Sequence, residues 1–303
     1  MLTLQDAIRP TTFIRSSKLN DRLGIDLTIA TETFQHTGSF KFRAAYNLAS
    51  SVEQDSILSA SSGNFGQALA YACKLLGKQC TVVMPDTSAR VKIDAVRGFG
   101  GNVDLVDVRK IGRNERVAQL AAEMPEAYFA SAYDDEYVIA GNSTLGEEIA
   151  GKGFDAIVVP VGGGGLISGI ITGLCRQGDT AEVFGAEPQM ANDAVRSFRA
   201  GKLIPNETEP TTIADGARTI SLGNLNWPII RDGAKDLLEV SDDAIIEALN
   251  LYFILANLKS EPTGAITLGT MLEYGSLFSG RKVCLVVSGG NVDPVVYRDL
   301  LKG

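Results

Sequence analysis

Short apolar runs bounded by glycine, aspartate or proline alternate along most of this chain with longer amphipathic segments. This alternation predicts an α/β fold with a parallel sheet, because each helix returns the chain to the edge where the previous strand began. The predicted strands are 27–31, 57–61, 80–84, 102–106, 128–130, 156–160, 182–187, 237–240 and 282–287. The predicted helices include 66–76, 88–99, 113–123, 141–150, 166–176 and 242–257, and the polar segment 201–212 is expected to be irregular.

The chain of 303 residues is longer than one ordinary domain, which predicts two subdomains that share a cleft. Its net charge of -8 comes from scattered acidic residues, and the sequence has no basic stripe. Nucleic acid and anionic membranes are therefore poor partners, and a small-molecule enzyme is expected.

The segment 1–13 contains Asp6 and Arg9 and has no long apolar core, so we do not expect it to be a signal peptide. No apolar run in the sequence approaches the length needed to span a bilayer, so we expect no membrane span. With a single histidine, His36, in the chain, we expect neither Ser-His-Asp nor Cys-His catalysis and no His-based zinc site. Acid–base chemistry would then depend on other side chains or on a cofactor. Four separated cysteines are predicted to be buried free thiols in a reducing cytoplasm: Cys73, Cys80, Cys175 and Cys284.

Lys41 stands between Phe40 and Phe42, after a Thr-Gly-Ser turn and before a helix-forming run. Flanking rings lower the local dielectric, and desolvation disfavours the ammonium form, so a larger share of the amine is neutral and able to form a Schiff base. The alternative interpretation is a surface lysine on the first turn of a helix.

Ligands of open parallel sheets gather at the carboxyl ends of the strands, so the loops after strands are the places to look for a site. The loop 59–67 carries Ser61, Ser62 and Asn64 at a helix start, where side-chain and backbone donors suit a carboxylate. Ordinary helix capping is the alternative.

Four consecutive glycines, 162–165, join a buried strand to a helix and suit a phosphate, because free N–H groups and the helix dipole meet there. The spacing matches neither the triphosphate loop nor the dinucleotide motif, and a purely structural turn is the alternative. A third loop places Ser288 at a strand end, where its hydroxyl can donate one hydrogen bond to a ring nitrogen without protonating it.

Together these stretches resemble the serine racemase and serine/threonine dehydratase family of fold-type II pyridoxal-phosphate enzymes. The resemblance rests on 37–44, 61–68, 138–141, 159–169, 214–216, 227–232, 261–264 and 288–293. It implies two open, twisted, mostly parallel sheets flanked by helices, as in tryptophan synthase β. A large cofactor-binding domain would comprise residues 1–49 and 134–303, and a small mobile domain residues 50–133. A homodimer is implied as well.

The resemblance also implies the roles of the cofactor-binding residues. Lys41 would be joined to the aldehyde of pyridoxal 5'-phosphate and, once released, would remove the substrate α-proton. Phe40 would pack beside the cofactor, while Asn64 and Ser288 would bind its ring 3′-oxygen and its ring nitrogen. The phosphate would be held by Gly162, Gly163, Gly164, Gly165 and Leu166.

The substrate carboxylate would be held by Ser61, Ser62, Gly63 and Asn64. In this resemblance Ser62 is also the base on the second face that racemisation requires. A divalent cation, Mg²⁺, Mn²⁺ or Ca²⁺, would be bound by the acidic site, defined as Glu187, Ala191 and Asp193. On spacing alone, acidic residues favoured by a helix dipole are the alternative.

The chain departs from the family pattern at several positions. Phe65 replaces a usual histidine and adds apolar bulk, and residues 140–144 replace a more usual Gly-Gln-Gly-Thr. Arg113 and Arg116 both lie near the place of an arginine that recognises substrate in some racemases. His36 stands where lysine or arginine is common, beside a nucleotide-effector site of some members, which leaves a nucleotide effector open.

The predicted activity is dehydration of a β-hydroxy amino acid such as serine or threonine to a 2-oxo acid and ammonia, with serine racemase activity permitted by Ser62. One alternative is a dehydratase for 3-hydroxyaspartate or a bulkier 3-hydroxy amino acid. Another is a β-replacement synthase of the cysteine synthase type, which would need a second nucleophile. A metabolite-binding protein without turnover is a further alternative.

Overall fold

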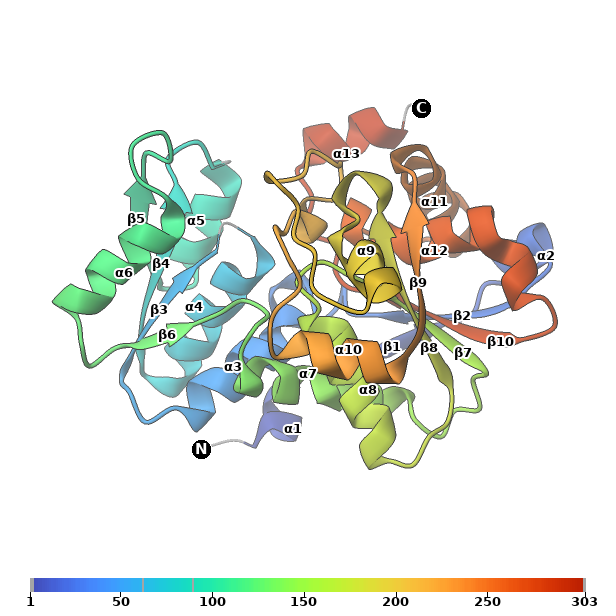
Figure 1. Cartoon of the computed structure of the whole chain (residues 1–303), viewed down its shortest axis with the longest axis horizontal. Coiled ribbons are helices and arrows are strands. Elements are labelled where there is room, and N and C mark those ends of the chain that lie inside the picture. The colour runs from blue at the N-terminus through green and yellow to red at the C-terminus, as the bar shows by residue number, and fades with distance from the viewer. Residues whose placement is uncertain (1–2, 62, 89, 302–303) are drawn as a thin grey trace.

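The computed structural model describes residues 3–61, 63–88 and 90–301 and contains two sheets flanked by helices (Figure 1). The strands are β1 (Thr12–Ile14), β2 (Asp26–Thr31), β3 (Ser56–Ala60), β4 (Gln79–Pro85), β5 (Asn102–Val106), β6 (Tyr128–Ala130), β7 (Ala156–Pro160), β8 (Glu182–Pro188), β9 (Ala234–Val240) and β10 (Lys282–Val287). The α-helices are α1 (Leu4–Ala7), α2 (Ser17–Leu23), α3 (Lys41–Ser51), α4 (Asn64–Leu76), α5 (Arg90–Gly98), α6 (Arg113–Glu123), α7 (Glu136–Ile149), α8 (Gly165–Arg176), α9 (Asp193–Ala200), α10 (Asn226–Gly233), α11 (Asp242–Ala256), α12 (Pro262–Tyr274) and α13 (Pro294–Leu301). Short 3₁₀ turns are η1 (His36–Gly38), η2 (Gln189–Ala191), η3 (Asp215–Ala217) and η4 (Gly275–Phe278).

The larger sheet has the strand order β1-β2-β10-β7-β8-β9, with only the edge pair β1 and β2 antiparallel. Its centre joins distant parts of the chain, because β10 lies between β2 and β7 and pairs in parallel with both. This order brings the segments that follow β2, β7 and β10 to one edge of the sheet.

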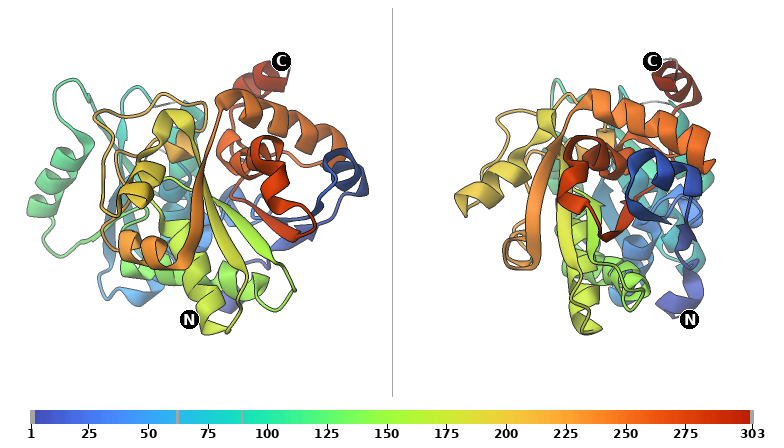
Figure 2. Two further views of the ribbon diagram at one scale, coloured as in Figure 1. Left: turned by 45° about the vertical axis from the view of Figure 1, so that its right-hand side comes forward. Right: turned by 90° about the vertical axis from the view of Figure 1, so that its right-hand side faces the viewer.

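The smaller sheet has the order β5-β4-β3-β6, and all of its strands are parallel. Figures 1 and 2 show it beside the larger sheet, with α3 and α4 between the two. The predicted α/β fold with two mostly parallel sheets is therefore confirmed.

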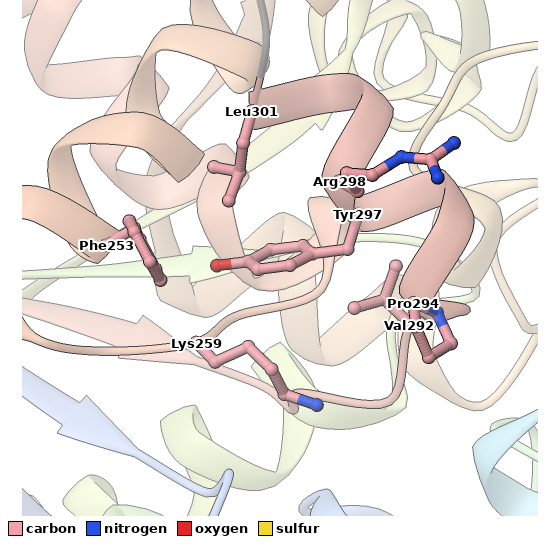
Figure 3. A pocket seen from close by; sticks show the side chains of 7 residues that line it. All are labelled: Phe253, Lys259, Val292, Pro294, Tyr297, Arg298 and Leu301. Carbon is pink, nitrogen blue, oxygen red and sulfur yellow. The ribbon is translucent and has the colours of Figure 1, made fainter.

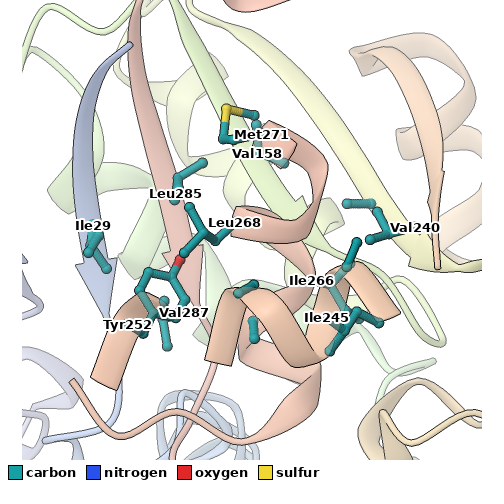
Figure 4. Close-up of a cluster of buried hydrophobic side chains, with 14 of the residues drawn as sticks. Ile29, Val158, Val240, Ile245, Tyr252, Ile266, Leu268, Met271, Leu285 and Val287 are labelled. Atoms are coloured by element: carbon teal, nitrogen blue, oxygen red, sulfur yellow. The ribbon is translucent and has the colours of Figure 1, made fainter. Parts of the chain in front are cut away.

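The larger sheet is covered on both faces, which the alternation along β7 explains. Val158 packs into a cluster with side chains of α11 and α12, whereas Ile157 and Val159 pack into a second cluster with α8. Figure 4 shows the first cluster, where Ile266 and Val158 belong to the same apolar layer. Burying one such side chain contributes about 1.5–3 kcal/mol, so a strand buried on both faces is strongly fixed in register.

Some elements differ from the prediction for identifiable reasons. Helix α7 begins five residues earlier than expected, at Glu136, because the Asp135 side chain accepts hydrogen bonds from the N–H groups of Tyr137 and Val138. Helix α12 was not predicted, because it is buried on nearly all sides and therefore has no amphipathic period.

The prediction that all four cysteines are buried is wrong for Cys175, which is exposed on the last turn of α8. All four thiols are free. Within the described ranges, no helix combines the length and apolar character that crossing a bilayer requires.

Candidate active site

Lys41 begins α3 and is held against the loop that follows β10. The N–H of Phe40 donates to the carbonyl of Ser288 at 2.9 Å, and the N–H of Gly290 donates to the carbonyl of Gly38 at 3.0 Å. Gly38 has a φ of 73°, a conformation that glycine adopts without strain. These contacts fix the lysine beside the end of β10.

The Lys41 amine lies in an apolar environment. Its Nζ donates to the Ala132 carbonyl at 2.7 Å and lies 4.9 Å from the Phe40 ring centroid and 5.8 Å from that of Phe65. Burial lowers the pKa of Lys41 to about 8, although the nearby Glu261 carboxylate acts in the opposite direction. A larger share of this amine is therefore neutral near pH 7 than in an exposed lysine, which contradicts the surface-lysine alternative.

Phe65, which replaces the usual histidine, is 1% exposed and belongs to the core cluster around α3 and α4. The Phe65 side chain therefore fills the core and does not project into an open part of the site. Its ring forms one apolar wall beside the Lys41 amine.

The loop between β3 and α4 carries the predicted carboxylate cradle. The Ser61 Oγ accepts from the N–H of Gly66 at 3.1 Å and from that of Gly63 at 3.5 Å, which leaves the hydroxyl proton of Ser61 able to donate. Ser62, the predicted second base, lies outside the described residues. The Ser61 side chain thus accepts hydrogen bonds at the start of α4 and keeps a hydroxyl proton that can be donated to a ligand.

Asn64 is the centre of a contact that the sequence did not reveal. Its amide donates to both carboxylate oxygens of Glu261, at 2.9 and 3.1 Å, while Asn291 donates to the Asn64 carbonyl oxygen at 2.8 Å and to the Thr37 carbonyl at 2.6 Å. Burial raises the pKa of Glu261 to about 8. Glu261 and Asn291 both lie in stretches that carry the family resemblance, but no local pattern links residues 64 and 261.

The four glycines form a bend that only glycine fits. Gly164 has a φ of 91°, a Cβ at Gly162 would lie 2.8 Å from the Gly216 carbonyl oxygen, and a Cβ at Gly163 would overlap the Tyr133 ring. The Gly163 carbonyl accepts from the Asn226 amide at 2.9 Å.

Within the described part of the chain, the N–H groups of residues 162–164 have no protein acceptor. They stand at the N-terminus of α8, whose first turn contains Leu166. An anion is the expected partner of such a bend.

Ser288 supplies an independent test of the predicted cofactor. Its side chain is buried, with the residue 2% exposed, and its Oγ has no hydrogen-bond partner among the described residues. A buried hydroxyl without a partner is costly, so a ligand acceptor at this position is expected. An unpartnered hydroxyl, an anion-binding bend and a partly neutral lysine fit the ring nitrogen, phosphate and aldehyde of pyridoxal phosphate.

The acidic site lies between β8 and α9. Glu187 accepts from the N–H groups of Val195 at 2.6 Å and Ala194 at 3.2 Å, and Asp193 accepts from the Leu222 N–H at 3.0 Å. Burial raises the pKa of Glu187 well above its usual value and that of Asp193 to about 7. Among the described residues, no cluster of three or more His, Cys, Asp or Glu side chains could hold a metal.

Two other predicted positions have definite surroundings. Arg116 forms a two-pronged pair with Asp104 of β5, at 3.0 and 2.7 Å, and the side chain of Arg113 is not described. His36 packs against the rings of Phe42 and Tyr71, with centroids 4.8 and 5.7 Å away, and lines a hollow of about 520 Å³.

Comparisons with known proteins agree with this geometry. A family model described as pyridoxal-phosphate dependent enzyme matches residues 4–289. The chain is 35% identical to an L-threo-3-hydroxyaspartate ammonia-lyase of Saccharomyces cerevisiae, covering 99% of this chain and 93% of the relative. It is 37% identical to the serine racemase of Mus musculus, covering 96% and 89% of the two chains. A solved threonine deaminase from T.th. superimposes with a TM-score of 0.91 at 37% identity, covering 96% of this chain and 95% of that one. The chain therefore belongs to the family of pyridoxal-phosphate dependent enzymes.

Proposed function

We propose that this protein dehydrates a β-hydroxy amino acid, such as serine or threonine, to a 2-oxo acid and ammonia. The observation that carries the proposal is the Lys41 amine, buried between two aromatic rings, on a backbone that is hydrogen-bonded to that of Ser288, whose hydroxyl has no partner among the described residues. Relatives named as an ammonia-lyase and a threonine deaminase support this reaction class.

Pyridoxal phosphate, when bound, supplies an aldehyde for the substrate amine and a conjugated ring that accepts the electron pair of the Cα–H bond. Lys41 would hold the cofactor and then take the α-proton as a neutral amine, which its lowered pKa favours. Ser288 would donate to the ring nitrogen without protonating it, which moderates the ring as an electron acceptor and favours loss of hydroxide from the β-carbon. The N–H groups of the glycine bend would hold the phosphate, and the Ser61 loop the substrate carboxylate.

Racemase activity is a further part of the proposal, since the family includes serine racemases such as that of Mus musculus. It requires a base on the face opposite Lys41, and Ser62 is our candidate. Measuring D-serine formed from L-serine in a Ser62→Ala variant tests this role. Loss of racemisation with dehydration retained is expected.

A 3-hydroxyaspartate is the second candidate substrate. Lys92 of α5 pairs with Asp215 of η3 at 2.6 Å, so a cation stands between the two sheets, and its charge acts on Glu261. A substrate with a second carboxylate could take the place of Asp215 as the partner of Lys92. The 3-hydroxyaspartate ammonia-lyase relative supports this candidate.

We also propose that the smaller sheet with its helices forms the small domain, 50–133, and closes over the substrate, with Lys92 of this domain reaching Asp215 or a substrate carboxylate. Because the carboxylates of the acidic site are buried, a divalent cation held by Glu187, Asp193 and the Ala191 carbonyl would compensate their charge. Three further properties stay predictions. They are a homodimer, a nucleotide effector bound at the His36 hollow, and a cytoplasmic location, which is inferred from the four free thiols.

A substrate panel tests the proposal. The purified enzyme is given L-serine, D-serine, L-threonine and both 3-hydroxyaspartate diastereomers, and the 2-oxo acid is measured with and without a chelator. Lys41→Ala should abolish turnover and prevent borohydride from fixing a pyridoxyl group, while Lys202→Ala, at an exposed lysine on a loop, should change neither. If no substrate yields a 2-oxo acid, but added sulfide or another nucleophile yields a β-substituted amino acid, the β-replacement alternative is favoured instead. Lys92→Met should lower turnover of 3-hydroxyaspartate more than that of serine.

A further inference from the structure

A hollow of about 490 Å³ lies between α11, α13 and the segment that joins β10 to α13 (Figure 3). Its walls are mainly apolar: Phe253, Val292, Pro294 and Leu301 contribute carbon atoms, and Phe253 is 52% exposed. A cavity of this size is within the range of small-molecule sites and can hold an aromatic ring with a short substituent.

Tyr297 gives the hollow a buried polar group. The residue is 9% exposed, and among the described residues its hydroxyl has no hydrogen-bond partner. Figure 3 shows this hydroxyl pointing toward Phe253, between Leu301 and Lys259. Since a buried hydroxyl is rarely left without a partner, a ligand acceptor in the hollow would complete its bonding.

Lys259 adds a positive charge to the same hollow. Among the described residues, the lysines found in ion pairs are Lys92, Lys110 and Lys235, and Lys259 is not one of them. The other cation of the lining, Arg298, is already paired with Asp299 at 2.7 Å, and Figure 3 shows its guanidinium directed away from the Tyr297 hydroxyl. The polar groups of the lining that have no partner among the described residues are therefore two donors: the buried Tyr297 hydroxyl and the Lys259 ammonium, which Figure 3 shows on the side of the hollow toward Pro294.

We propose that this hollow is a second ligand site, which binds a small carboxylate with an apolar body. The carboxylate would accept from Lys259 and from the Tyr297 hydroxyl, and the apolar body would cover Phe253 and Leu301. A bare phosphate would leave these carbon atoms exposed, and an amine would meet Lys259 with a like charge.

The hollow is separate from the proposed catalytic residues, yet its walls adjoin them in the chain. Val292 directly follows Asn291, which bonds to Asn64, and a Cβ at Gly290 would lie 3.0 Å from the carbonyl oxygen of Lys259. A ligand here would thus contact the backbone that carries part of the active site.

Phenylacetate is the probe, titrated into the cofactor-loaded enzyme by calorimetry. We expect saturable binding with a Kd of about 1 mM, as suits a ligand of this size. Lys259→Met and Tyr297→Phe should each weaken binding by about three- to fivefold while leaving kcat/KM unchanged. Lys202→Met, the matched control at an exposed lysine away from the hollow, should bind as the wild type.

Three results would overturn the proposal. Phenylacetate could fail to saturate, or it could bind both variants with wild-type affinity, which would place it at the carboxylate cradle of the active site. Inorganic phosphate or 2-phenylethylamine could bind as tightly as phenylacetate, which would remove the need for a carboxylate joined to an apolar body.

Discussion

Because the Ser288 hydroxyl has no partner among the described residues, we expect Ser288→Ala to change stability in opposite directions with and without the cofactor. In the cofactor-free protein this hydroxyl is buried without a hydrogen bond, a state that costs about 1–3 kcal/mol. Alanine removes the hydroxyl without adding volume. The variant should therefore be more stable than the wild type by about 1 kcal/mol when the cofactor is absent.

The effect should reverse when the cofactor is bound. Loss of one hydrogen bond to the ring nitrogen should weaken cofactor affinity by about tenfold, which corresponds to about 1.4 kcal/mol. In the same excess of cofactor, the stabilisation that binding adds should fall by this amount. The loaded variant would then be slightly less stable than the loaded wild type.

Urea unfolding of both forms, with the cofactor removed by hydroxylamine in one, measures the two effects. Ser59→Ala is the matched control, because the Ser59 hydroxyl is equally buried but donates to the Ala130 carbonyl at 3.0 Å. It should cost about 1 kcal/mol in both forms and leave the contribution of the cofactor unchanged. The reasoning is refuted if Ser288→Ala destabilises the cofactor-free protein as Ser59→Ala does, or if cofactor affinity does not change.

Three further predictions concern charges. Arg43→Met should lower the free energy of unfolding, measured in urea, by about 3–5 kcal/mol, because it leaves the buried Glu32 carboxylate without its partner at 2.7 Å. The control Arg116→Met, at a partly exposed pair, should lower it by only about 1 kcal/mol. Equal losses in the two variants would contradict the role of burial. The stability of the cofactor-free protein should have a minimum near pH 8. The raised pKa of Glu261 makes stability fall as the pH rises from 4.5 to about 8. The lowered pKa of Lys41 makes stability rise again as the pH goes from about 8 to 10.5. Urea titrations that show a stability maximum near pH 8 would disprove these two pKa shifts. A chelator should lower the melting temperature and activity, and added Mg²⁺ should restore both; an unchanged melting temperature would argue against a cation at the acidic site.

Much of the fold could be predicted because its information is local. The strands and the loops after them carry apolar runs, glycines and hydroxyl groups in order, and the sheet brings those loops to one edge. The contact between Asn64 and Glu261 could not be predicted this way, because 197 residues separate the partners and no local pattern links them. Helix α12 could not be predicted for a different reason. It is buried on nearly all sides, so its sequence lacks the apolar–polar periodicity that identifies a surface helix.

The central position of β10 has a consequence for the synthesis of the chain. Residues 282–287 are inserted between β2 and β7, and the loop after them holds the backbone around Lys41. The smaller sheet, complete by residue 130, can form on the ribosome well before this insertion. Until β10 emerges, β2 and β7 have unpaired edges that invite aggregation, so chaperone demand should peak late in translation.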